Sequence, residues 1–252
     1  MILIENVSFS YRDVPILRDI NLALPKGGIT ALVGPNGAGK SSLLSLVARL
    51  QPLQKGRISV DGLPVDTTPS RTLAQRLAIL RQDGIVASRL TVRELIGFGR
   101  FPHHQGRPDA IDLALVEAAL AQFDLVPLAG RFIDTLSGGQ RQRAMVAMTF
   151  CQGTDYLLLD EPLNNLDMFH ARQLMQSLRR IADEAARTAI IVLHDINQAA
   201  AYADRIVAMR DGRVIVDGPP EAVLTEENME AVFGYRIRIE QFAGKPFLLH
   251  HL

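Results

Sequence analysis

The sequence predicts one large α/β domain with a parallel β-sheet and an attached helical lobe. Short apolar runs alternate with segments of helical spacing, a glycine-rich loop joins one apolar run to the next helix, and the middle of the chain lacks comparable strand patterns. The length of 252 residues suits a single domain that carries a lobe, because two full domains would be cramped in it.

The first part of the chain is predicted to contain two strands and a helix. Residues 2–9 alternate and are rich in β-forming residues, and a glycine turn leads into the apolar run 29–33. After the glycine-rich loop, apolar residues recur at helical spacing from Leu43 to Leu50, and Pro52 ends the pattern. Strand, glycine loop and helix therefore follow one another directly.

Two later apolar runs, residues 156–159 and 189–193, are also predicted to be strands. Between them, Leu174, Leu178 and Ile181 mark one face of a helix. Buried parallel strands joined by a crossover helix are the simplest interpretation of this order.

The middle of the chain, residues 83–150, is predicted to be a helical subdomain inserted in the single domain 1–252. Helical spacing recurs there, as in Leu113, Val116 and Leu120, without strand patterns comparable to those on either side.

The last part of the chain is predicted to contain further strands. The dipeptide Asp211-Gly212 predicts a hairpin turn, and residues 236–240 alternate as expected for a late edge strand. Internal repeats and low-complexity tracts are absent from the sequence.

Composition and charge exclude several classes of protein. With 48% hydrophobic and 21% charged residues, the chain is neither disordered nor fibrous. Lys plus Arg and Asp plus Glu both number 27, so the net charge offers no argument for nucleic acid as the main partner.

The single cysteine, Cys151, is predicted to be a small core residue in a reducing compartment. Because no run of about 18 apolar residues occurs, we expect a cytosolic protein that reaches a membrane only through a partner.

The glycine-rich loop fits the pattern G-x-x-x-x-G-K-[ST] and stands between a strand and a helix. Its residues are Gly34, Pro35, Asn36, Gly37, Ala38, Gly39, Lys40 and Ser41. Glycines let backbone N–H groups face phosphates, and the helix amino terminus adds partial positive charge. Lys40 is predicted to meet the β and γ phosphates, and Ser41 Oγ to bind magnesium. An ordinary tight turn is the alternative, but the context favours a site for magnesium-ATP.

A pair of acids makes ATP hydrolysis more probable than nucleotide binding alone. The apolar run 156–159 delivers Asp160 and Glu161 to the carboxyl end of a strand, where ligands of α/β sheets bind. Asp160 is predicted to hold magnesium, and Glu161 to polarise the water that attacks the γ phosphate. Taken alone, the two acids are equally consistent with a solvated strand end.

The run Leu136-Ser137-Gly138-Gly139-Gln140 closely resembles the signature that separates ABC ATPases from other P-loop proteins. The resemblance implies the ABC ATPase core, a mostly parallel sheet plus an antiparallel β part, with an inserted helical subdomain. It also implies a head-to-tail homodimer, since in this family the signature meets the nucleotide on the opposite protomer. For the pentapeptide alone, a serine helix cap followed by a flexible glycine pair is the alternative.

Further residues match positions of the same family one at a time. Tyr11 lies where the family stacks an aromatic ring on adenine, and Ser42 belongs with the nucleotide-binding loop. Gln82 matches the glutamine that touches magnesium and the attacking water, and His194 matches the switch histidine that contacts the γ phosphate. Asp167 matches the loop that crosses the dimer interface. Taken alone, each of these residues has an ordinary structural explanation.

Residues 90–95 and 99–103 look like the importer group that serves iron(III)-siderophores, haem and vitamin B12, and residues 161–168 are similar to its siderophore members. The resemblance implies an ATPase that powers iron(III)-siderophore uptake, with haem or vitamin B12 as alternative cargo. Its partners would be two membrane-spanning permease subunits, whose coupling helices meet the segment after Gln82, and indirectly a substrate-binding protein. The chain would then lie peripherally at the cytoplasmic face of the cell membrane.

Two other classes of function are weighed against transport. A soluble ABC protein that acts on ribosomes or DNA usually carries two cassettes or a long coiled coil, whereas this chain has one phosphate loop and no heptad stretch. A nucleotide sensor without turnover would lack Glu161 or His194, and both are present. We therefore expect no nucleic-acid partner.

Overall fold

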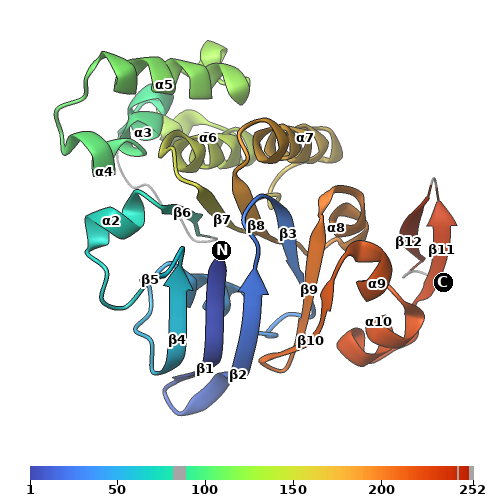
Figure 1. Cartoon of the computed structure of the whole chain (residues 1–252). Coiled ribbons are helices and arrows are strands. Elements are labelled where there is room, and N and C mark those ends of the chain that lie inside the picture. The colour runs from blue at the N-terminus through green and yellow to red at the C-terminus, as the bar shows by residue number, and fades with distance from the viewer. Residues whose placement is uncertain (82–88, 243, 250–252) are drawn as a thin grey trace. The chain divides into compact units, whose positions relative to one another are not determined.

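The computed structural model describes residues 1–81, 89–242 and 244–249, which divide into two units (Figure 1). The first unit comprises Met1–Thr68 and Thr188–Leu252, and the second comprises Pro69–Arg187. Both contain strands and helices, so the predicted α/β class is confirmed. None of the described helices has the length and apolar character that crossing a membrane requires.

The first unit opens with an antiparallel sheet in the order β2-β1-β4-β5. Its strands are β1 (Ile2–Tyr11), β2 (Val14–Leu24), β4 (Lys55–Val60) and β5 (Leu63–Pro64). Side chains of β1 are buried in two alternating pairs, Ile2 with Ile4 and Val7 with Phe9. Such a period of two is typical of a strand with one face toward the core. The shift of this period after Ile4 coincides with an irregularity in the register between β1 and β2.

The same unit contains the order β10-β9-β3-β8, in which β3 pairs in parallel with both β8 and β9. These strands are β3 (Gly28–Val33), β8 (Thr188–Val192), β9 (Arg205–Arg210) and β10 (Arg213–Gly218). Every residue of β8 is buried, as parallel strands covered on both faces require. The predicted hairpin turn at Asp211 and Gly212 joins β9 to β10, and both residues have positive φ, 48° and 75°.

The other described elements of the first unit are helices and a hairpin. They are α1 (Lys40–Val47), α8 (Ile196–Tyr202), α9 (Pro220–Val223), α10 (Glu226–Phe233), β11 (Arg238–Phe242) and β12 (Lys245–Leu249). The helix predicted to run to Leu50 ends at Val47, because Arg49 turns into the left-handed region with φ 55° and Leu50 N–H bonds back to Ser45 O.

The late strand begins at Arg238 rather than at residue 236. Arg236 forms an ion pair of 2.8 Å with Glu226 of α10, and Ile237 is buried in the core. Their side chains therefore tie the connection to the helix and the core before the strand starts.

The second unit pairs β6 (Leu77–Leu80) in parallel with β7 (Tyr156–Asp160). Its helices are α2 (Ser70–Ala74), α3 (Val92–Phe98), α4 (Phe101–His104), α5 (Ala110–Gln122), α6 (Gly138–Cys151) and α7 (Met168–Glu184), with short 3₁₀ turns at Val126–Leu128 and Ile133–Thr135. Helices α3, α5 and α6 pack against one another. Apart from Cys151, the last residue of α6, they lie within the range 83–150 predicted as the helical subdomain, and those limits stay a prediction.

One predicted helical face is partly wrong. Val116 and Leu120 of α5 are buried as expected, whereas Leu113 is 59% exposed. At Leu113 the helix borders a pocket rather than close-packed side chains, so the spacing of the three residues does not translate into equal burial. By contrast, Leu174 and Leu178 of α7 are both buried.

We expect Ile191→Ala to lower the free energy of unfolding by about 2–5 kcal/mol. Ile191 of β8 is 0% exposed, so truncating its side chain would leave a cavity in the core. The matched change Ile111→Ala removes the same atoms from a side chain that is 68% exposed, and should cost less than about 0.5 kcal/mol. Thermal unfolding of both variants without nucleotide checks this, and equal losses would contradict it.

Candidate functional site

The glycine-rich loop leaves the end of β3 in a conformation that requires glycine. Gly34 has φ 140°, and a Cβ there would lie 2.0 Å from Met209 O of the neighbouring strand β9. Gly39 has φ 98°, and a Cβ there would lie 2.6 Å from Leu17 Cδ2. Gly37, with φ 80°, has open space around it and needs glycine for its backbone conformation alone. Larger residues are therefore excluded at Gly34 by a backbone contact as well as by φ, and are disfavoured at Gly39 mainly by φ.

The loop ends at the amino terminus of α1, whose N-cap is Gly39. Glycine offers no side-chain acceptor, and the sequence supplies no acid in the first turn of α1, so the partial positive charge of this end is not neutralised locally. The Lys40 side chain is buried at 5% exposure, and its Nζ donates to Gly34 O at 2.8 Å and to Pro35 O at 3.0 Å. The ammonium group is thus held over the loop, next to the helix terminus.

His194 leaves the sheet at the same edge as the loop. Leu32 of β3 is paired with Val192 of β8, and Leu193 N–H donates to Leu32 O at 3.1 Å. Because the two strands are parallel, the loop after β3 and His194 after β8 both follow their carboxyl ends. His194 is exposed there, and Asp195 caps the helix α8 that follows.

Tyr11 lies at the end of β1, paired with Val14 of β2. Its ring is 56% exposed, and the Arg12 guanidinium lies 5.7 Å from the ring centroid. The ring is therefore accessible for stacking on a planar group.

In the second unit, Asp160 is the buried last residue of β7, and Glu161 follows it in a strained conformation with φ 51°. Non-glycine residues held at positive φ concentrate at functional sites. Asn164 Nδ2 donates to Glu161 Oε2 at 2.6 Å, and Gln142 Nε2 of α6 donates to Pro162 O at 3.1 Å. The carboxylate is thus oriented by its own loop, and that loop is held by α6.

The signature residues meet the loop that carries Asp167. Ser137 and Gln140 form a capping box at the start of α6, and Asp167 caps α7 by accepting from His170 N–H at 2.8 Å. Both helix starts line one hollow of about 320 Å³, together with Gly138 and Gly139. The predicted set Ser137 to Gln140 and Asp167 is therefore brought together within this unit.

Sequence reasoning missed three residues of the same hollow, namely Arg143, Asn165 and His170. Hydrogen bonds from the backbone and side chain of His170 lower the pKa of Asp167 below its usual range. Arg143 lies three residues after Gln140, and His170 lies three residues after the cap Asp167, so helical spacing could have pointed to both. Gln82, predicted as a ligand of magnesium and water, lies outside the described residues.

Residues 17–164 match the family model described as ABC transporter. The chain belongs to the ABC transporter family. It is 46% identical over 239 residues to the petrobactin import ATP-binding protein FatE of Bacillus anthracis, covering 95% of this chain and 96% of FatE. It is 36% identical over 249 residues to the ferric enterobactin transport ATP-binding protein FepC of Escherichia coli (strain K12), covering 97% and 92%.

Solved ABC structures have the same fold. A metal-chelate type ABC transporter in an inward-facing conformation superposes with a TM-score of 0.84 at 26% identity, covering 98% of this chain and 96% of that chain. The dimeric structure of the bacterial ABC transporter cassette MJ0796 gives a TM-score of 0.79 at 25% identity, covering 87% and 98%. The chain is thus an ABC ATPase that binds ATP, and cassettes of this kind form dimers and work with membrane permease components.

Cys151 of this ABC ATPase is a core residue, as predicted, and is 3% exposed. Burial raises the pKa of its thiol to about 11, which outweighs the opposing effects of Arg100 and Arg187.

We expect Cys151 to resist Ellman's reagent in the native protein at about pH 8, because the thiolate is the reactive form and the native thiol stays protonated at that pH. In guanidinium chloride the single cysteine should react fully within the mixing time. Fast stoichiometric labelling of the native chain would contradict the assignment.

Proposed function

We propose that this chain is the ATP-hydrolysing subunit of an importer that takes up iron(III)-siderophores, bound peripherally at the cytoplasmic face of the cell membrane. The observation that carries the cargo assignment is the agreement among relatives that span nearly the whole chain: their names specify petrobactin, iron(3+)-hydroxamate and ferric enterobactin. The glycine-rich loop, over which the Lys40 ammonium group is held, supports the ATPase assignment independently of the names of the relatives.

The nucleotide is proposed to bind along the glycine-rich loop. Lys40 would exchange its contacts with Gly34 O and Pro35 O for the β and γ phosphate oxygens, while backbone N–H groups at the start of α1 face the same anion. Tyr11 offers its exposed ring to the adenine, and Ser41 and Ser42 follow the lysine at the helix start.

Magnesium fits the donors that the chain provides, since the Ser41 hydroxyl and the Asp160 carboxylate are hard oxygen ligands. These residues and Gln82 are proposed to hold the ion, directly or through water. When bound, the ion would neutralise charge on the phosphate oxygens.

Hydrolysis is assigned to Glu161 and His194. Glu161, oriented by Asn164, is proposed to accept a proton from the attacking water, and Gln82 to orient that water. His194, at the edge of the sheet where the phosphate loop also begins, would donate a hydrogen bond to the γ phosphate as charge develops.

A second copy is proposed to complete each ATP site. The hollow between Ser137 and Asp167 combines two helix starts, where backbone N–H groups favour anions, with the Arg143 side chain. It would receive the triphosphate held by the loop of the partner copy, as the head-to-tail dimer of the family implies. The exposed Met168 and Phe169, next to Asp167, would add apolar contact area to such an interface.

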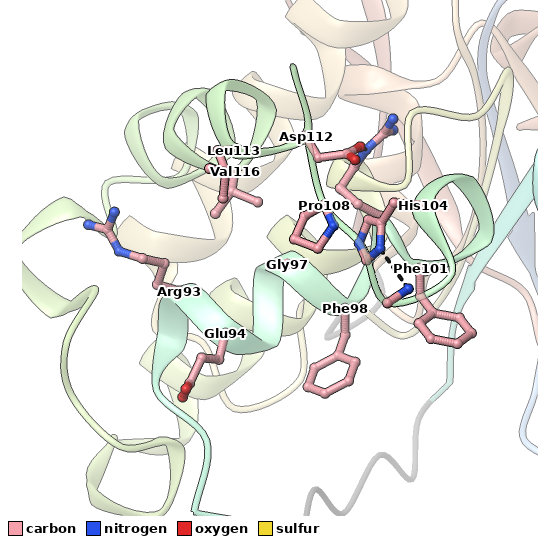
Figure 2. A pocket seen from close by; sticks show the side chains of 12 residues that line it. Arg93, Glu94, Gly97, Phe98, Phe101, His104, Pro108, Asp112, Leu113 and Val116 are labelled. Carbon is pink, nitrogen blue, oxygen red and sulfur yellow. Dashed lines mark hydrogen bonds and ion pairs between the residues drawn. The ribbon is translucent and has the colours of Figure 1, made fainter. Parts of the chain in front are cut away.

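The permease subunits are proposed to dock on the face of the second unit that carries the residues after position 89. A pocket of about 420 Å³ lies between α3, α4 and α5 there, and it is lined by apolar side chains such as Phe98 and Val116 together with charged ones such as Arg93 and Glu94 (Figure 2). Phe98 and Phe101 remain 51% and 53% exposed beside it, as expected for a surface that a partner covers. A substrate-binding protein would meet the permease rather than this chain.

Glu161→Gln should reduce ATP turnover by about 100-fold or more, because a general base is lost while the side-chain shape is kept. The same variant should form a dimer that depends on ATP and magnesium, measurable by size-exclusion chromatography with light scattering. Adding Lys40→Ala to it should abolish both this dimer and the rise in melting temperature that ATP produces. A persistent monomer of the Glu161→Gln variant with ATP would contradict the clamp, and an unchanged thermal shift in Lys40→Ala would contradict the role of the lysine.

Reconstitution with the permease and its binding protein tests the cargo. We expect ferric siderophores to raise ATP turnover and to enter proteoliposomes, whereas haem and cobalamin should do neither. Glu161→Gln complexes supply the matched control without hydrolysis. Uptake of haem or cobalamin alone would replace the siderophore assignment, and no response to any of the three would refute it.

A further inference from the structure

The corner between α3 and α4 packs directly on the carboxyl end of α6. At Gly99 the two backbones approach so closely that a Cβ would lie 2.2 Å from Met148 O and 3.2 Å from Gln152 N. His103 Nε2 lies 2.8 Å from Gln152 O. This corner is therefore built to contact the last turn of α6.

Arg100 occupies the centre of the contact and is 8% exposed. Its Nε donates to Asp112 Oδ1 of α5 at 2.9 Å, and its Nη1 donates to Cys151 O at 3.3 Å and to Gln152 O at 3.1 Å. One guanidinium thus joins α5 to the carbonyl groups that α6 leaves without helical partners. A cation at this end also complements the partial negative charge of the helix.

Asp112 is ionised in this pair. Burial opposes its ionisation, but the hydrogen bonds from the Arg100 side chain and the Asp109 backbone outweigh burial, so the pKa of Asp112 lies below its ordinary value. A buried charge pair of this kind is weak evidence for stability by itself, because removing two charges from water is costly. The position of the Arg100–Asp112 pair between α5 and the end of α6 indicates a role other than stability.

The next residues close around the same guanidinium. Gly153 has φ 75°, and a Cβ there would lie 2.7 Å from Arg100 Nη1. Gln152 Nε2 donates to Ala74 O at 2.6 Å and to Leu77 O at 3.1 Å, which ties the end of α6 to α2 and β6. The carboxyl end of α6 is consequently fixed by the hydrogen bonds from Arg100, by the close contact with Gly99 and by the link from Gln152 to α2 and β6.

Both ends of α6 now have an assigned place. The start of α6 contributes Ser137 to Gln140 to the hollow that also contains Asp167, and the end of α6 accepts hydrogen bonds from Arg100. The helix has 14 residues and so spans about 21 Å as a single rod. Arg100 and Asp112 also line the pocket between α3, α4 and α5, where Figure 2 shows Asp112 together with Leu113 and Val116 of α5.

We propose that Arg100 is a positioning residue for ATP hydrolysis: it fixes the carboxyl end of α6, and thereby the orientation of the signature residues toward the nucleotide of the second copy. The inference rests on the proposed clamp, in which the signature meets ATP across the dimer. Because Arg100 and Asp112 line the pocket between α3, α4 and α5, a partner group that enters this pocket would contact the pair that orients α6.

Two variants test the proposal while keeping the fold. Arg100→Lys keeps a charge opposite Asp112 but replaces the five-donor fork with one ammonium, which cannot reach Asp112 and both carbonyls together. The double variant Arg100→Met with Asp112→Leu replaces the pair by apolar side chains, a change that proteins often tolerate. The matched control is Arg205→Met with Asp217→Leu, which removes a partly buried pair of 2.6 Å from the first unit.

Steady-state ATP hydrolysis is measured well below the lowest melting temperature of the set. We expect both Arg100 variants to lower kcat about tenfold, with KM for ATP changed less than about twofold, because charged hydrogen bonds to α6 are lost while the phosphate loop is untouched. The control should keep the wild-type kcat even if its melting temperature falls. A wild-type kcat in Arg100→Lys, or an equal loss in the control, would overturn the positioning role.

A second measurement separates this inference from the clamp itself. In the Glu161→Gln background, Arg100→Lys should weaken ATP-dependent dimer formation relative to Glu161→Gln alone. If Glu161→Gln forms no dimer with Arg100 intact, the clamp fails. If dimer formation and kcat are both unaffected by Arg100→Lys, only the positioning role fails.

Discussion

The close approach of β3 and β9 at the start of the glycine-rich loop is the constraint on which the first unit depends. Gly34 passes so near Met209 O that any Cβ is excluded, and the loop must then turn with positive φ before α1 begins. This turn places the uncapped start of α1 and the buried Lys40 ammonium at the carboxyl edge of parallel strands. The pairing of β3 with its other neighbour, β8, brings His194 to that edge. The proposed phosphate loop and His194 thus reach one edge because β3 lies between β9 and β8.

The second unit is organised around α6 in a comparable way. Its amino end supplies a capped helix start to the hollow with Asp167, its middle holds the loop after Glu161 through Gln142, and its carboxyl end is bound by Arg100. Three parts of the proposed chemistry therefore depend on the orientation of one helix. Since helices move as rods, a contact at one end is transmitted to the other.

Charged and apolar side chains meet beside that helix. The Arg100–Asp112 pair is buried and lines the pocket between α3, α4 and α5, which is also bordered by the exposed rings of Phe98 and Phe101. A partner surface that fits this lining would combine apolar contact with Phe98 and Phe101 and polar contact with Arg93 or Glu94. The pair satisfies its own hydrogen bonds within the chain, so a partner can cover it without leaving either charge unpaired.

By itself the sequence determined the features that depend on neighbours along the chain: the glycine loop before α1, the turn at Asp211 and Gly212, the strand that ends at Asp160, and the serine cap of the signature helix. Local backbone geometry and capping decide these. Only the tertiary structure decided the exposure of Leu113, the early end of α1, the late start of β11 and the presence of His170 beside Ser137. It alone joined Arg100 to carbonyls 51 and 52 residues away. Such contacts arise from the packing of helices that are distant in sequence, which periodicity along a single helix does not encode.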